Sequence, residues 1–245
     1  MNWKKIVSLA SFCLLAAAAP TSHAESIANA QLSGFTYTLI DLNPGDGIAP
    51  SLTLTNPSYW IAAAAYPDSS GHPNPVDIIN HPGGASVTDS TGGATSLYVD
   101  TLAFSFTHVS GTSPRFSADT TVQWDFALTP HTAAVIMGYG SIFSQQTSDA
   151  VVNAYAAVFA SYKTNPADLY ETYLDDSLYS YRGPQQSKVL NITVVAGNAE
   201  LDGRLGFATS TSGQGFAAPV PEPETYAMFL GGLVVVAFAR RRSKA

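Results

Sequence analysis

The residues with the greatest catalytic potential in this 245-residue chain are two adjacent carboxylates, Asp175 and Asp176. A glycosidase needs two carboxylates that face each other about 5–10 Å apart across a cleft. Adjacent residues instead point to opposite faces of a strand, and they diverge by about 100° in a helix. The chain also contains no G-x-S-x-G nucleophile motif. We therefore predict no catalytic residue.

Histidines that could bind a metal are spread along the chain as His72, His81, His108 and His131. His72 and His81 each precede a proline, and their spacing matches no metal-binding motif. His108 continues the apolar alternation that runs from Leu102 to Phe106, so we expect it at the end of a core strand. The histidine pattern therefore predicts no metal site.

The segment from Asp41 to Gly47 resembles the start of a calcium-binding loop, because potential oxygen ligands alternate along it. The EF-hand pattern needs glycine at its sixth position and glutamate at its twelfth, where this chain has Asp46 and Leu52. The sequence Asn-Pro-Gly-Asp-Gly within the segment is typical of a turn. We predict neither a metal nor a cofactor.

Aromatic side chains offer a binding function in place of a catalytic one. They form two groups along the chain: Tyr59, Trp60 and Tyr66 in the first, and Tyr170, Tyr173, Tyr179 and Tyr181 in the second. Either group could stack on sugar rings, although aromatic side chains also fill protein cores. The sequence leaves both interpretations open.

Residues 25–219 alternate short apolar segments with clusters of Gly, Pro, Asn, Asp and Ser, which is typical of an all-β domain. Apolar and polar residues alternate most clearly from Val122 to Leu128. The same pattern recurs at 102–107, 190–194 and 201–207, and further strands are expected at 35–40, 51–55 and 132–138. One apolar face per strand predicts an antiparallel two-sheet sandwich of jelly-roll type.

Three segments are harder to assign. Residues 150–162 fit both helical and alternating spacing, and we favour a strand. Asn165 and Pro166 are typical of a helix N-cap and first turn. They predict one short helix whose apolar face extends to Leu174. Residues 66–93 are rich in proline and glycine, which predicts a long surface loop.

Composition excludes several functions. The chain is 46% hydrophobic and 12% charged, so it can bury a sizeable core. Residues 25–219 carry five basic and sixteen acidic side chains, and this balance argues against a nucleic-acid partner. The single cysteine, Cys13, lies in the N-terminal apolar segment, so the domain that follows has no disulfide and no thiol nucleophile.

The first 24 residues are typical of a secretory signal peptide. Lys4 and Lys5 precede an apolar run at 6–19, and the small residues Ser22 and Ala24 follow it. Signal peptidase needs small side chains at these two positions, so we predict cleavage after Ala24. The apolar run is also shorter than the roughly 20 residues that a membrane-spanning helix needs.

The last 26 residues contain three features in a fixed order. A proline-rich motif is followed by a charge-free, largely apolar run at 225–239 and then by a basic cluster. The motif consists of Pro221, Glu222 and Pro223, and the cluster consists of Arg240, Arg241, Arg242 and Lys244. The prolines disfavour helix within the motif, and the basic cluster acts as a stop on the cytoplasmic side.

This order of features resembles the PEP-CTERM sorting signal, and the resemblance is confined to about residues 220–245. It implies export through the inner membrane, recognition by an exosortase-like enzyme, and delivery to the cell surface or extracellular matrix. The apolar run would span only about 22 Å as a helix. This is shorter than the roughly 30 Å hydrocarbon core of a bilayer, and snorkelling of the arginines with local thinning would make up the difference. We expect the tail to anchor the protein in the membrane at least before processing, and its later removal or retention stays open.

We thus expect a signal peptide at 1–24, a β-sandwich domain at 25–219 and a sorting and anchor segment at 220–245, with hydrophobic helical segments at both termini. The expected function is that of a non-catalytic structural or adhesive component of the cell surface or biofilm matrix. Two alternatives stay open. One is a carbohydrate-binding module with exopolysaccharide as its partner, and the other is a secreted hydrolase.

Overall fold

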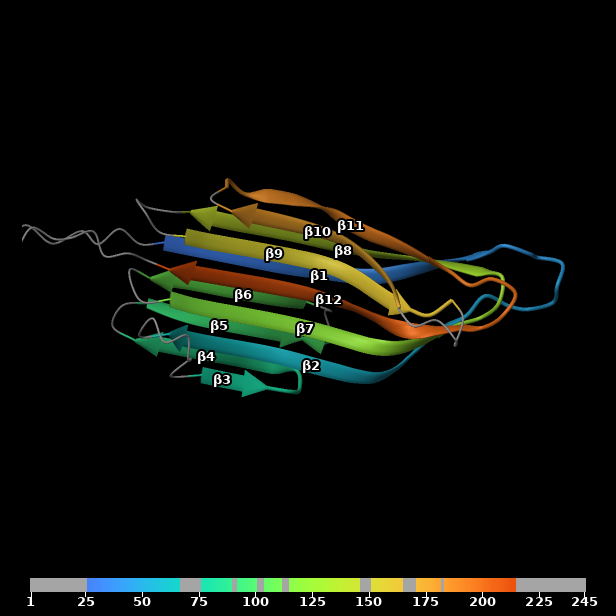
Figure 1. The fold of residues 1–245 in the computed structure, drawn as a ribbon, viewed down its shortest axis with the longest axis horizontal. Helices are drawn as coiled ribbons and strands as arrows, with labels where there is room; N and C mark the ends of the chain where they lie inside the picture. Colours follow the sequence, from blue (N-terminus) through green and yellow to red (C-terminus); the bar gives the residue numbers. More distant parts are fainter. Residues whose placement is uncertain are drawn as a thin grey trace, which may run out of the picture. The chain divides into compact units, whose positions relative to one another are not determined.

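The computed structural model describes residues 26–66, 76–89, 92–100, 104–111, 115–145, 151–164, 171–181 and 183–214. These residues form strands that belong to one compact unit, residues 24–216 (Figure 1). In chain order the strands are β1 (Ser26–Asp41), β2 (Leu52–Tyr66), β3 (Val76–Ile79), β4 (Gly83–Asp89), β5 (Gly92–Val99), β6 (Phe104–Gly111), β7 (Arg115–Leu128), β8 (Thr132–Gln145), β9 (Val151–Tyr162), β10 (Thr172–Tyr181), β11 (Gln186–Val195) and β12 (Leu201–Gln214). Over the described ranges, no helix is long and apolar enough to cross a membrane.

The strands form two antiparallel six-stranded sheets that pack face to face (Figure 1). Sheet A has the order β11-β8-β1-β6-β5-β4, and sheet B has the order β10-β9-β12-β7-β2-β3. β10 lies beside β11 along one open side of the sandwich, and β3 lies beside β4 along the other. Ser26 pairs with Gly111 and Gln214 pairs with Arg115, so the described chain starts and finishes at the same end of the domain.

These sheets confirm the prediction of an all-β domain, and residues 151–162 form the favoured strand. The prediction of a loop over 66–93 is wrong, because β3, β4 and β5 lie there. Leu174 lies in β10, not on a helix. The described residues do not include 165–170, the terminal segments, the cleavage position Ala24 or the tail motif, so the helices expected there stay predictions. The jelly-roll type of the sandwich also stays a prediction.

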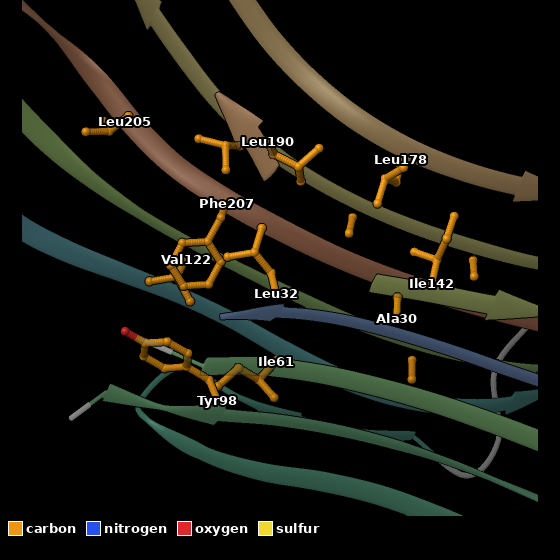
Figure 2. Close-up of a cluster of buried hydrophobic side chains, with 14 of the residues drawn as sticks. Ala30, Leu32, Ile61, Tyr98, Val122, Ile142, Leu178, Leu190, Leu205 and Phe207 are labelled. Carbon is orange, nitrogen blue, oxygen red and sulfur yellow. The ribbon is translucent and has the colours of Figure 1, made fainter. Parts of the chain in front are cut away.

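The core lies between the sheets and is centred on Phe207, which is 0% exposed (Figure 2). Its ring packs against Phe35, Tyr98 and Trp124, with ring centroids 5.4–5.9 Å apart. Burial of the Tyr98 hydroxyl, which donates a hydrogen bond to Asp100, raises the pKa of that tyrosine above its usual range. The aromatic centre is flanked by aliphatic side chains from both sheets, as Figure 2 shows.

Two β-bulges allow long strands to keep their apolar side chains in this core. The register of β1 shifts between Ser33 and Thr36, where Gly34 has a φ of 65°. An extra residue on one strand reverses which residues face inward, so Leu32 before the bulge and Phe35 after it both contact the core. Glycine adopts this positive φ without steric strain. In β2, Asn56 with a φ of 49° lies in the equivalent bulge.

Strand β6 faces the opposite way from the sequence prediction. The apolar alternation predicted that Phe104, Phe106 and His108 face the core, but Ser105 and Thr107 are the buried residues. The Ser105 hydroxyl lies 2.5 Å from that of Thr209 in the other sheet. Small inward-facing side chains bring the two sheets close enough for such hydroxyl pairs, and this leaves no room for phenylalanine between them.

One aspartate spans each open side of the sandwich. Along the first side, Asp176 of β10 accepts the backbone N–H of Asn191 at 2.9 Å and the Lys188 ammonium at 2.6 Å, both in β11. Burial alone would raise the pKa of Asp176, but these hydrogen bonds lower it overall. Along the other side, Asp77 of β3 accepts the backbone N–H of Ser86 in β4 at 2.9 Å. Each carboxylate therefore occupies a backbone donor on the edge strand of sheet A.

His131 joins three loops at one end of the sandwich. Its backbone N–H donates to Gly197, and its carbonyl accepts the N–H of Leu42. Its side chain contacts Asp46 at 2.5 Å and Asn198 at 3.0 Å. The backbone φ of 55° at His131 is uncommon outside glycine, and it directs these groups toward the neighbouring loops. His131 is thus a structural residue of the loop end.

The pair of Asp46 and His131 predicts a pH-dependent stability. Hydrogen bonds from the Ile48 N–H and from His131 lower the pKa of Asp46 below 3.8, and Asp46 raises the pKa of His131 above 6.5. The histidine contribution is complete below pH 6.5 and is lost as pH rises through its raised pKa. The aspartate contribution is lost as pH falls through its lowered pKa. The melting temperature of the wild type should therefore exceed that of His131→Ala by the largest amount between pH 3.8 and pH 6.5, and the difference should become smaller toward pH 9. A difference that stays constant between pH 4 and 9 would contradict the pair.

Candidate functional site

The outer face of sheet B carries exposed aromatic side chains along β9 and β10. Alternate residues of β9, from Val152 to Ala160, face the core, so the residues between them face outward. On β10 the outward residues include Tyr173 and Tyr179, which are each 59% exposed. We call the outward aromatic residues of these two strands the aromatic layer; they are Tyr155, Phe159, Tyr173, Tyr179 and Tyr181.

At one end of the aromatic layer, rings from β9 and β10 are stacked. The Phe159 and Tyr173 rings are stacked with centroids 6.2 Å apart and planes 18° from parallel. Phe159 also lies opposite Gly206 of β12, and a Cβ atom on Gly206 would come within 2.9 Å of the tip of the phenylalanine ring. Because glycine has no side chain, the tip of the Phe159 ring can lie close to the backbone of β12 at Gly206.

The other end of the aromatic layer is built on a cross-strand pair. Tyr155 of β9 lies directly opposite Tyr179 of β10, and the Tyr179 hydroxyl donates a 3.2 Å hydrogen bond to Asn153. Between the two ends lies Ala157, which is fully buried although it faces outward. Neighbouring side chains must cover Ala157, so the layer is continuous along the strands.

The hydroxyls of Tyr155 and Tyr173 stay protonated at neutral pH. Burial and the nearby Asp175 raise the pKa of Tyr173 above 10.0. Burial, Tyr173 and Asp175 together raise the pKa of Tyr155 in the same direction. Each hydroxyl can therefore donate as well as accept a hydrogen bond at the rim of an apolar surface. The layer can hold a ligand that has an apolar face and polar edges.

Replacing Gly206 with alanine tests the close packing of Phe159 against this glycine. The new Cβ would lie 2.3 Å from the Val122 carbonyl oxygen and would displace the ring, so we expect a loss of about 1–3 kcal/mol in the free energy of unfolding. Urea titration measures this loss. Gly197→Ala is the control, because no atom lies within 4 Å of the added methyl group. Equal stabilities of the two variants would contradict the close contact.

The structure brings together part of the aromatic residues singled out from the sequence. Tyr173, Tyr179 and Tyr181 share the outer face of β10, while Tyr170 lies outside the described residues. The first group is divided. Trp60 is 53% exposed on the outer face of β2, whereas Tyr59 packs against the core and its ring contacts Tyr98. Tyr66 lies under the Arg115 guanidinium, 5.1 Å from ring centroid to Cζ.

The acidic residues do not form a comparable site. Asp175 is exposed beside the aromatic layer, and Asp176 is turned toward β11. A surface hollow of about 630 Å³ lies near one end of sheet B, and its lining includes Asp125, Glu171, Glu200 and Asp202 together with Lys163 and Arg204. Across the part of the chain that the structure describes, no group of three or more His, Cys, Asp or Glu residues could hold a metal ion.

Sequence reasoning missed Tyr155, Phe159 and Gly206. Residues 151–162 have a weak alternation because alanines occupy three core-facing positions and one outward position. The alternation of Val152, Ala154, Ala156 and Val158, all of which are buried, places Tyr155 and Phe159 outward, but alternation alone does not mark an outward surface as functional. No sequence signal pairs Gly206 with Phe159, because this contact depends on the register between β9 and β12.

Comparison with known proteins gives information on the end of the chain only. The family model described as the PEP-CTERM protein-sorting motif matches residues 219–243, a range that contains Pro221 to Pro223. No curated protein and no solved structure matches the chain significantly.

Proposed function

We propose that the β domain of this chain serves at the cell surface as a structural or adhesive component. The chain carries a PEP-CTERM sorting motif, which marks an exported protein that exosortase sorts to the cell surface. In this proposal the domain catalyses no reaction. The observation that supports an adhesive role is the exposed aromatic layer. Contiguous exposed apolar surface is typical of interaction sites, and tyrosine adds hydrogen-bonding groups at its rim.

The form of the domain supports the same role. Its strands are up to 16 residues long, which corresponds to about 50 Å at the usual rise per residue. The aromatic layer follows two of these strands on a face that no described element covers. Such a domain can present a long, flat surface to a partner.

Sorting is tested by deleting Pro221 to Pro223 in the native host and separating cytoplasmic, membrane and surface fractions. We expect the deletion variant to be retained in the membrane fraction with its precursor mass. Unchanged surface exposure of the variant would refute the dependence on the motif.

Adhesion is tested with cells that display the Tyr173→Ala/Tyr179→Ala variant. These cells should settle or attach less than cells with the wild-type protein, because the variant removes the two most exposed rings of the layer. Protease shaving must release equal amounts of both proteins from the surface. Equal attachment at equal display would contradict the adhesive role.

A further inference from the structure

We propose that the aromatic layer binds a neutral glycan chain, with sugar rings stacked on Phe159 and Tyr173 and on Tyr155 and Tyr179. This inference rests on the proposed adhesive function and names the chemistry of the partner. It depends on the geometry of the rings, the polar groups beside them and the charge of the face.

The geometry of the rings fits a pyranose. The C–H groups of a sugar ring form a flat apolar face, and they pack on an aromatic ring that is itself accessible from above. Phe159 and Tyr173 are 18° from parallel, and the tip of the Phe159 ring lies close to Gly206, so the two rings form one aromatic surface. Phe159 and Tyr155 are four residues apart on β9, which is about 13 Å along the strand. Two stacking positions therefore lie along one line.

Polar groups lie beside the aromatic rings along β9 and β10. Asn153 accepts a hydrogen bond from Tyr179, and its amide nitrogen is 3.4 Å from the Ser212 hydroxyl. Asp175 and Ser177 lie on β10 between Tyr173 and Tyr179. Planar amide and carboxylate groups beside aromatic rings provide both acceptors and donors for sugar hydroxyls.

The charge of the face disfavours an anionic ligand. Asp175 is the single charged residue among the outward positions of β9 and β10. Residues 25–219 carry an excess of eleven negative charges. A polyanion such as an acidic polysaccharide would be repelled by this net charge. It would find no basic side chain among the outward residues of β9 and β10, and the nearby Arg204 of β12, opposite Ser161, lies 4.0 Å from the Asp125 carboxylate. The favoured ligand is therefore uncharged.

A row of small residues connects the layer to a further exposed ring. Cross-strand pairing places Ser177, Ala157, Ala208, Thr121 and Trp60 in one line across sheet B. Trp60 is separated from β10 by four strand spacings, about 19 Å. The neighbouring side chains that cover Ala157 lie at the layer end of this row, and beyond them a branch of the glycan, or a second chain, can reach Trp60 across Ala208 and Thr121.

Affinity electrophoresis of the full chain tests the proposal. The protein is kept in a detergent without a sugar headgroup and is run through gels that contain hydroxyethyl cellulose, dextran or galactomannan, with alginate as the anionic comparison. Wild type should be retarded in at least one neutral gel and not in alginate. Tyr173→Ala/Tyr179→Ala should weaken that retardation about fivefold or more, because it removes one ring from each stacking position.

Tyr139→Ala is the matched control, since Tyr139 is similarly exposed but lies on sheet A. Tyr173→Phe/Tyr179→Phe keeps the rings and should retain most of the retardation. The proposal is overturned by no retardation in any neutral gel, by retardation in alginate alone, or by equal retardation of the double alanine variant. Any of these results, combined with reduced attachment of cells that display the double alanine variant, would leave the adhesive function intact with another partner.

Discussion

Replacing Phe207 with alanine is expected to lower the free energy of unfolding by about 3–5 kcal/mol. Phe207 is 0% exposed and contacts aromatic rings from three other strands, so the substitution creates a cavity that its neighbours cannot fill. Domains of this kind are commonly stable by only about 5–15 kcal/mol, and the loss is therefore a large part of the total.

Urea titration followed by tryptophan fluorescence measures this effect, because Trp124 packs against the Phe207 ring. Tyr139→Ala removes a ring of similar size from an exposed position and should change the midpoint little. Phe207→Leu should lie between the two. A loss below 1 kcal/mol for Phe207→Ala would show that the ring is not the centre of the core.

The second large effect is expected from the double variant Asp77→Ala/Asp176→Ala, which should self-associate. Each substitution frees a backbone N–H on an edge strand of sheet A, namely that of Ser86 in β4 or of Asn191 in β11. Unpaired edge strands offer a template for pairing with another chain, and inward-pointing charges are one way in which proteins prevent it. Loss of both carboxylates removes that protection on both open sides of the sandwich.

Sedimentation velocity over a range of concentrations measures the association. Wild type should sediment at the same rate throughout, while the double variant should form larger species as concentration rises. Asp175→Ala/Asp202→Ala is the control, because it removes the same charge from exposed outer positions and leaves both edges capped. If the control associates as strongly as the double variant, net charge and not edge capping is responsible.

Sequence pattern predicted strands well where one face is wholly apolar. The run from Val122 to Leu128 is such a case, and its inward residues are those that alternation indicates. Alternation gave the wrong buried face for β6, because Thr209 of the opposite sheet packs against Ser105 and leaves no room for Phe106 to point inward. The buried face of a strand thus depends on the residues of the opposite sheet, and the sequence of that strand alone does not determine it.

Other features depend on contacts between distant segments. The strands β3, β4 and β5 lie in a segment that proline and glycine predict to be a loop, and pairing with β2 and β6 makes them part of the sheets. Tyr173 and Tyr179 were recognisable as candidates because they are aromatic and close in sequence. Phe159 and Gly206 were not, because they are 47 residues apart and meet only through strand register.

The common position of the two chain ends has a mechanical consequence. β12 ends at Gln214, and it pairs with β7 along its whole length and with β9 from Gly203 onward. A pull on the C-terminal segment along the strand axis would load both ladders of hydrogen bonds at once, in shear. The strand that connects the domain to its sorting segment is therefore held against extraction by a paired strand on each side.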